Sequence, residues 1–312
     1  MNRRTLAILI AAIAMFLLLT ACTIFTQAAD MPQPTTEPAD ASTTEAVPTN
    51  PATVPTVEQA PTAEPPTAAP AGLSISIDGV QFILPPELGT GANAAIVPEY
   101  QVPTDGFGEN VPAYIQINLQ GYPVVPAEGV MTAATIKIAY ADGNIAGMMG
   151  DTAMIDAINS SPDMPLTQAN IPSNYLLMAS NIKRLTNENG SLNGARMLSL
   201  HGNGMILAAN DGSLTYQYHA VTSDHRYYLI LELPITSAML PADMNAPVPD
   251  GGVNPANLPD ITEYYPKVSE LLNAQEMAGA LSPSIALMDQ LAGSIHIDSS
   301  QIVLPDPLPA AQ

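Results

Sequence analysis

Hydrophobic and polar residues alternate along short segments after residue 72, which is the pattern of β-strands with one buried face. The first two segments, residues 73–77 and 80–84, flank Asp78-Gly79. This pair suits the positive φ angles of a tight turn, so it predicts a β-hairpin. Further strands are predicted at residues 114–119, 135–140, 195–200, 205–208, 214–221 and 227–233, the last two forming a hairpin through residues 222–225, with a closing strand at 294–297.

Two segments show the three- and four-residue spacing of helices with one buried face. The first covers residues 151–159. The second covers residues 261–272 and follows Asp260 and Glu263, which have the spacing of a capping box.

A third helix is predicted at residues 283–292, with Ser282 as its N-cap, Pro283 at its first position and Gly293 after its end. Strands arranged in hairpins, one helix in the middle and helices near the C-terminus are typical of an α+β domain. We therefore expect a largely antiparallel sheet that is covered by these helices.

The N-terminus has the features of a bacterial lipoprotein signal peptide. Arg3 and Arg4 precede an apolar run at residues 5–19, and small residues then lead through Ala21 to Cys22. The run is shorter than the ~20 residues that span a membrane. We expect residues 1–21 to be removed between Ala21 and Cys22, with Cys22 lipidated and anchored to the membrane.

This anchor predicts an extracytoplasmic location, on the outer face of the cytoplasmic membrane or on an outer membrane if the cell has one. The residues that follow it, 22–71, are rich in Pro, Thr and Ala. Such a composition provides too little apolar area to fold, so we expect a disordered, extended stalk that lifts a domain from the lipid surface or acts as a passive spacer.

The chain is acidic, with 8 Lys and Arg against 29 Asp and Glu and a net charge of −21. Removal of Arg3 and Arg4 with the signal peptide brings this charge to about −23. Nucleic acid is excluded as a partner, because binding to phosphates depends on clustered basic residues. The acidity is explained by the solubility of an exported domain.

Cys22 is the sole cysteine, so the exported part has no disulfide and no thiolate metal site. We expect residues 72–312 to form a single domain with a Pro- and Gly-rich loop at 241–259. The sequence shows no motif for a cofactor, and no His-x-x-x-His spacing for zinc. The four histidines are expected to be surface residues, and no catalytic residue is predicted.

Tyrosines concentrate on the predicted hairpin of residues 214–233. Tyr216, Tyr218, Tyr227 and Tyr228 could present a sheet face that binds a ligand or glycan by stacking, although cross-strand aromatic packing is the more common role. The absence of Trp and the presence of only 4 Phe make a dedicated carbohydrate platform less favoured.

The C-terminal part of the chain resembles an uncharacterised group of bacterial exported lipoproteins. The resemblance rests on the segment from Leu214 to Pro234, the proline-rich loop, Tyr264-Tyr265 and the closing helical segment at 282–291. The resemblance covers about the last 100 residues. Members of that group often have glycine where this chain has His225. The group implies no site residues. The order of elements also resembles the αβα sandwich of the PsbP and Mog1 proteins, which implies an accessory or binding module.

Three functions follow as hypotheses. The first is a non-enzymatic, lipid-anchored domain that binds an envelope protein or a small ligand, and it predicts a closed core without a polar pocket. The second is a solute-capture lipoprotein of a transporter, which predicts two lobes. The third is an extracytoplasmic hydrolase, which requires a concave site with a histidine beside Ser or Asp. Whether His201, His219 and His225 converge distinguishes the third from the first.

Overall fold

The computed structural model describes residues 72–103, 109–130, 132–141, 145–148, 152–160, 166–167, 175–187, 189–202 and 204–305. The chain divides into two compact units, Met1–Pro65 and Pro66–Gln312. The first unit lies outside the described residues, as do the predicted signal peptide, Cys22 and the stalk. The fold below is that of the second unit.

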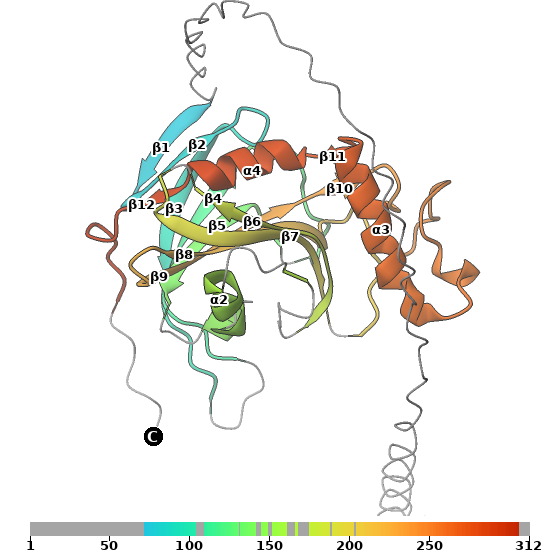
Figure 1. Ribbon diagram of the computed structural model, residues 1–312, viewed down its shortest axis with the longest axis horizontal. Helices are drawn as coiled ribbons and strands as arrows, with labels where there is room; N and C mark the ends of the chain where they lie inside the picture. Colours follow the sequence, from blue (N-terminus) through green and yellow to red (C-terminus); the bar gives the residue numbers. More distant parts are fainter. Residues whose placement is uncertain are drawn as a thin grey trace, which may run out of the picture. The chain divides into compact units, whose positions relative to one another are not determined.

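A seven-stranded antiparallel sheet forms the centre of this unit (Figure 1). Together with the helices on its two sides it confirms the predicted α+β fold. The strands are ordered β3-β4-β5-β9-β8-β7-β6. Their bounds are β3 Gly91–Val97, β4 Tyr114–Gln120, β5 Thr135–Tyr140, β6 Leu176–Thr186, β7 Leu192–His201, β8 Leu214–Thr222 and β9 Tyr227–Pro234.

The predicted N-terminal hairpin is present as β1 Leu73–Ile77 and β2 Val80–Leu84. Asp78 and Gly79 have φ angles of 48° and 82°, which is the geometry expected of a tight hairpin turn. The short strand β12, His296–Ile297, pairs with β2 and brings the end of the fold to its beginning. A two-stranded ladder joins β10, Thr236–Ser237, to β11, Leu281–Ser282.

Helices cover both sides of the sheet. In Figure 1, α4 lies above it and α2 below it. None of the helices in the described ranges is long and apolar enough to cross a bilayer. The helices are η1 Ile145–Met148, α2 Thr152–Asn159, η3 Pro255–Asn257, η4 Ile261–Glu263, α3 Tyr264–Met277 and α4 Ile285–Ser294.

The two faces of the sheet differ because side chains alternate along each strand. One face carries buried apolar residues such as Ile117, Leu231 and Leu198, which pack against α3, α4 and the β1–β2 hairpin. The cross-strand register places polar side chains on the opposite face, among them Lys137, Glu232 and Gln217. The sheet therefore has one apolar face, which forms the main core, and one face with several polar side chains, which we call the polar face.

Residues 205–208 were predicted as a strand, and this prediction was wrong. The segment has no regular structure. The hydroxyl of Tyr265 accepts a hydrogen bond from Ile206 N at 3.2 Å, and that of Tyr264 accepts one from Ala208 N at 3.0 Å. Two tyrosine hydroxyls of α3 thus accept the hydrogen bonds that, in a β-strand, would go to the carbonyl groups of a neighbouring strand.

The predicted start and end of the C-terminal helix were also wrong. Ser284, and not Ser282, is the N-cap of α4, and Ser282 pairs within β11. Gly293 lies inside the helix. Asp260 caps the 3-10 helix η4 and not α3, because its carboxylate accepts from Thr262 N at 2.9 Å.

Two strands of the seven-stranded sheet, β3 and β6, were not predicted, nor were the two-residue strands β10 and β11. The sequence of β3, Gly-Ala-Asn-Ala-Ala-Ile-Val, has mostly small side chains and weak alternation. In β6 the register shifts between Ser180 and Lys183, and Asn181 has a φ of 54°, so the alternation is interrupted. The predicted hairpin of β8 and β9 is confirmed, and His225 in its turn has a φ of 58°, a conformation that glycine favours.

Candidate functional site

The four tyrosines proposed as a stacking face are buried, each at most 1% exposed. Tyr216, Tyr218 and Tyr227 belong to the main core, and Tyr227 stacks on Tyr140 with ring centroids 5.4 Å apart. Tyr228 lies in a separate core cluster. These rings pack inside the domain, so they do not form an open platform for a ligand.

The histidines were expected at the surface, and for His219 this was wrong. His219 is 1% exposed on the polar face of β8. Its Nε2 lies 3.1 Å from Gln217 Oε1, and His201 Nε2 lies 3.4 Å from the same oxygen. His201 and His219 therefore converge on one amide, whereas His225 lies exposed in the β8–β9 turn.

This histidine pair belongs to a polar row that crosses four strands. Lys137 of β5 donates to Glu232 Oε2 of β9 at 3.1 Å. Glu232 lies opposite Gln217 of β8 in the register, and Gln217 bonds to His201 of β7. Glu232 and Gln217 are at most 2% exposed, so the row is buried although strand alternation places it away from the apolar core.

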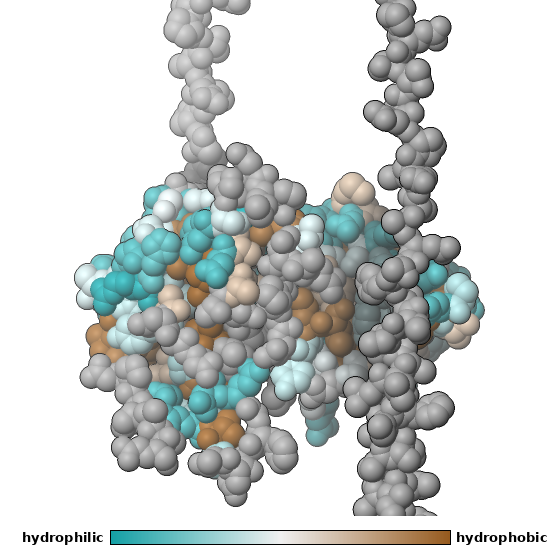
Figure 2. Space-filling model, turned by 60° about the horizontal axis from the view of Figure 1, so that its bottom comes forward, coloured by the Kyte–Doolittle hydropathy of each residue, from teal (hydrophilic) through white to brown (hydrophobic). Residues whose placement is uncertain are grey.

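A pocket opens over part of this row, with a volume of about 580 Å³. This volume is in the range of small-molecule sites. It lies on the face that α2 partly covers, where Met154 and Ile158 pack on Ala195 and Met197. Figure 2 turns this side forward and shows hydrophobic and hydrophilic residues next to each other. The polar lining includes Lys137, His201, Asp211, Ser213, Thr215 and Glu232.

Several polar atoms in and beside this pocket have no hydrogen-bond partner within the described part of the chain. They are His201 Nδ1, Ser213 Oγ and Gln217 Nε2, and all three atoms are buried. An unpaired buried polar group costs free energy, and natural proteins keep few of them. Three of the seven buried, unpartnered side-chain atoms among the described residues lie in or beside this pocket, which makes it the candidate site.

Neither the comparison with protein-family models nor that with curated proteins gives a match for this chain. The site is therefore interpreted from its own geometry and chemistry.

Burial makes both site histidines neutral at pH 7. It lowers the pKa of His219 to about 3, and the positive charges of Lys137 and, at low pH, of a protonated His201 act in the same direction. Burial also lowers the pKa of His201, against the opposing effects of Gln217 and Glu232. Since Gln217 Oε1 only accepts, the Nε2–H of each ring donates to it, and His219 Nδ1 accepts from the Tyr228 hydroxyl at 2.6 Å.

We predict that the protein loses stability as the pH falls through the ordinary histidine range. The unfolded chain protonates His219 below about pH 6.5, whereas the folded chain keeps it neutral down to about pH 3. The free energy of unfolding should therefore fall by about 2 kcal/mol between pH 7 and pH 5 from this residue. Urea unfolding at both pH values measures this change.

The control for this prediction is His219→Gln, which keeps a neutral hydrogen-bonding side chain but removes the titration. Its carboxyl groups are the same as in the parent chain, so the difference between the two pH dependences isolates the histidine. An equal loss of stability in both proteins would contradict the assignment of a depressed pKa to His219.

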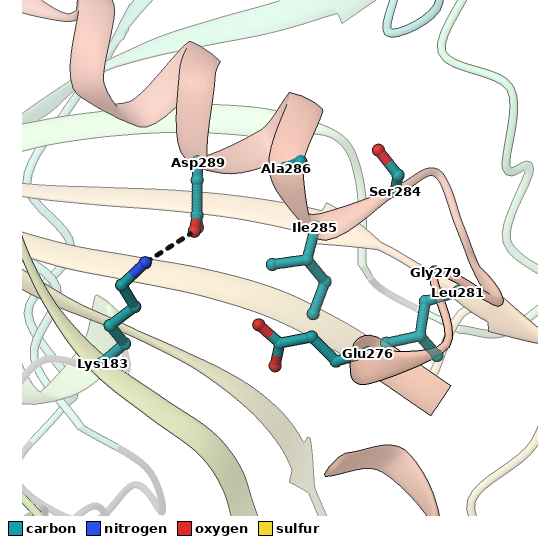
Figure 3. Close-up of a pocket in the computed structure, with 8 residues that line it drawn as sticks. All are labelled: Lys183, Glu276, Gly279, Leu281, Ser284, Ile285, Ala286 and Asp289. Atoms are coloured by element: carbon teal, nitrogen blue, oxygen red, sulfur yellow. Dashed lines mark ion pairs between the residues drawn. The ribbon is translucent and has the colours of Figure 1, made fainter. Parts of the chain in front are cut away.

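A second, smaller pocket of about 280 Å³ lies between β6, α3 and α4 (Figure 3). Lys183 and Asp289 face each other across it at 3.8 Å. Arg196, whose side chain is 3% exposed, donates hydrogen bonds to both carboxylate oxygens of Glu276. Its Nε lies 3.3 Å from Asp289 Oδ1, which makes an ion pair but not a hydrogen bond. Tyr216 donates to Asp289 at 3.0 Å.

The charged groups of this second pocket pair with one another. Burial favours the neutral form of Glu276, but hydrogen bonds from Arg196 and Asn181 lower its pKa below the ordinary value. Burial raises the pKa of Asp289 despite Arg196. This network connects α3 and α4 to the sheet, so we interpret it as structural.

No group of three or more His, Cys, Asp or Glu residues in the described ranges has the geometry to hold a metal ion. Sequence reasoning missed the polar row. The signal that could have found it is the polar composition of one face of β8, where Thr215, Gln217 and His219 alternate with the apolar Leu214, Tyr216 and Tyr218.

Proposed function

We propose that this protein is a cell-envelope lipoprotein whose exported domain binds a small polar ligand in the pocket of the polar sheet face. In this proposal Cys22 carries the lipid, residues 22–71 form the tether, and the domain has a non-enzymatic role. The expectation of a closed domain without a polar pocket is not part of the proposal, because the pocket is present.

The observation that supports ligand binding is the set of unpartnered buried atoms at the pocket. His201 Nδ1 and Ser213 Oγ, which line the pocket, and Gln217 Nε2 beside them are buried and have no hydrogen-bond partner among the described residues. A polar ligand that bonds to them would recover this free energy, whereas a purely structural sheet face would gain from apolar residues at the same positions.

Catalysis has weaker support. A hydrolase needs a nucleophile hydrogen-bonded to a general base. The side-chain hydrogen bond of His201 goes to Gln217, and those of His219 go to Gln217 and Tyr228, so within the described part neither histidine activates a serine or is oriented by an aspartate. The two lobes expected of a solute-capture protein also lack support, since Pro66–Gln312 forms one compact unit.

The proposal is tested with two matched serine variants of the full-length lipoprotein in detergent. Ser213 and Ser180 both have buried, unpartnered hydroxyls, but only Ser213 lines the pocket. Because no hydrogen bond is lost, Ser213→Ala and Ser180→Ala should each leave the ligand-free stability unchanged or slightly higher.

A panel of sugars, amino acids, nucleosides and polyamines is then screened by thermal unfolding. A ligand present at a hundredfold excess over its Kd stabilises the folded protein by about 2.7 kcal/mol. We expect one class to stabilise the parent chain and Ser180→Ala fully and Ser213→Ala less. Failure of every class to stabilise the parent chain, or equal stabilisation of both variants, would refute binding at this pocket.

A further inference from the structure

The mouth of the polar-face pocket carries an exposed aromatic ring. Tyr175 lines the pocket and is 55% exposed. Its φ is 66°, a left-handed conformation that is rare for a bulky residue. Such strain is concentrated at ligand-binding positions, because packing alone does not require it.

The backbone around Tyr175 is held in this conformation. Its carbonyl accepts a hydrogen bond from Gly202 N at 2.8 Å. A Cβ at Gly202 would lie 1.9 Å from the end of the Ile206 side chain, so a larger residue at this position requires Ile206 to move. The ring of Tyr175 is thus presented at the mouth by a positioned backbone and not by a free loop end.

The floor of the pocket has both hydrogen-bond donors and acceptors in need of partners. Since His201 Nε2 donates to Gln217, the neutral ring leaves Nδ1 as an acceptor. The Ser213 hydroxyl, which also lines the pocket, can act as donor or acceptor. A ligand group that both donates and accepts within a short span satisfies this floor, and hydroxyl groups do so.

The charges at the pocket disfavour anions. Lys137 and Glu232 neutralise each other at 3.1 Å, and His201 is uncharged because burial lowers its pKa. The remaining formal charge is that of Asp211, which is 7% exposed and accepts a hydrogen bond from Ser213 N at 2.9 Å. A carboxylate in this position repels an acidic ligand and accepts hydrogen bonds from a neutral one.

We infer that the ligand of this pocket is a neutral saccharide, with one sugar ring stacked on Tyr175 and its hydroxyls bonded to His201 and Ser213. The inference rests on the proposed ligand-binding function and specifies its chemistry. Tyr175 is the one Tyr, Phe or Trp among the described residues that line the pocket, so it provides the stacking surface there. The apolar face of a sugar ring matches Tyr175, and the hydroxyl edge matches the polar floor.

The experiment measures binding of four related probes to the full-length lipoprotein in detergent by saturation-transfer difference NMR and titration. N-acetylglucosamine is the neutral ring, glucuronate the anionic ring, glucosamine the cationic ring, and sorbitol the neutral polyol without a ring. We expect N-acetylglucosamine to bind best, with its ring protons saturated, and glucuronate and sorbitol to bind about tenfold more weakly.

Variants at the mouth separate stacking from folding. Tyr175→Gly removes the ring and suits the positive φ, so the fold should be retained while saccharide affinity falls about three- to tenfold. Tyr175→Phe keeps the ring and should bind with nearly parental affinity. Tyr100→Ala is the matched control, because Tyr100 is similarly exposed, at 57%, and is not a pocket-lining residue.

The outcomes distinguish the inference from the function on which it rests. Preferential binding of glucuronate, glucosamine or sorbitol would overturn the saccharide inference, as would unchanged affinity in Tyr175→Gly. Either result leaves ligand binding at the pocket intact if Ser213→Ala weakens it. Absence of N-acetylglucosamine binding also overturns the inference, and the broader panel with the serine variants then decides the proposed function separately.

Discussion

Replacement of Arg196 by alanine is expected to destabilise the domain by about 3–5 kcal/mol. Its guanidinium is 3% exposed and forms ion pairs with Glu276 of α3 and Asp289 of α4. Removing it leaves two carboxylates near the apolar face without their buried partner, and a cavity where the side chain packed. Such a loss approaches the whole stability of an ordinary domain.

Urea unfolding measures this effect, and Lys183→Ala provides the matched control. Lys183 lies 3.8 Å from the same Asp289, but its side chain is 59% exposed, and exposed ion pairs contribute about 1 kcal/mol or less. We expect the two variants to differ because of burial and not because of charge type. If Arg196→Ala costs no more than Lys183→Ala, the network is not a structural connection between the helices and the sheet.

Replacement of Cys22 by serine is expected to abolish membrane attachment. The serine has no thiol to receive the diacylglyceryl group, and each buried methylene of such chains contributes about 0.8 kcal/mol to membrane binding. Radiolabelled palmitate should enter the parent chain and not the Cys22→Ser variant. After cell fractionation, the Cys22→Ser variant should be missing from the membrane fraction that detergent extracts.

The folded domain provides the control for the anchor prediction. Cys22 lies outside the described fold, so Cys22→Ser should leave the urea unfolding of the domain unchanged. If the variant stays on the membrane, or if label enters it, Cys22 is not the residue that carries the lipid anchor.

The strands were largely predictable because alternation is a local property. The β1–β2 hairpin followed from Asp78-Gly79, and β4, β5, β8 and β9 followed from their apolar positions. The strand prediction failed where the alternating pattern was present but the backbone amides bond to distant side chains and not to a neighbouring strand. Residues 205–208 look like a strand, but their amides bond to tyrosines about 60 residues away, with sequence separations of 56 and 59.

The candidate site was not predictable from the same pattern. Alternation indicates that Gln217, His219 and Glu232 point away from the apolar core, which in most antiparallel sheets means toward water. Here they are nearly fully buried. Whether a polar face is solvated or covered depends on α2 and on segments distant in sequence. The residues of the strand do not predict which segments will cover it.

By itself, the sequence determined the strand-rich α+β class and the N-terminal hairpin, because each depends on neighbouring residues; the export signal stays a prediction. Only the tertiary structure decided that four suggestive tyrosines are core, that two histidines share one amide, and that Lys137 meets Glu232 across 95 residues of chain. Pairing of β5, β9, β8 and β7 brings these groups together, and burial then changes their chemistry. A pocket is a property of this long-range arrangement, which local periodicity does not encode.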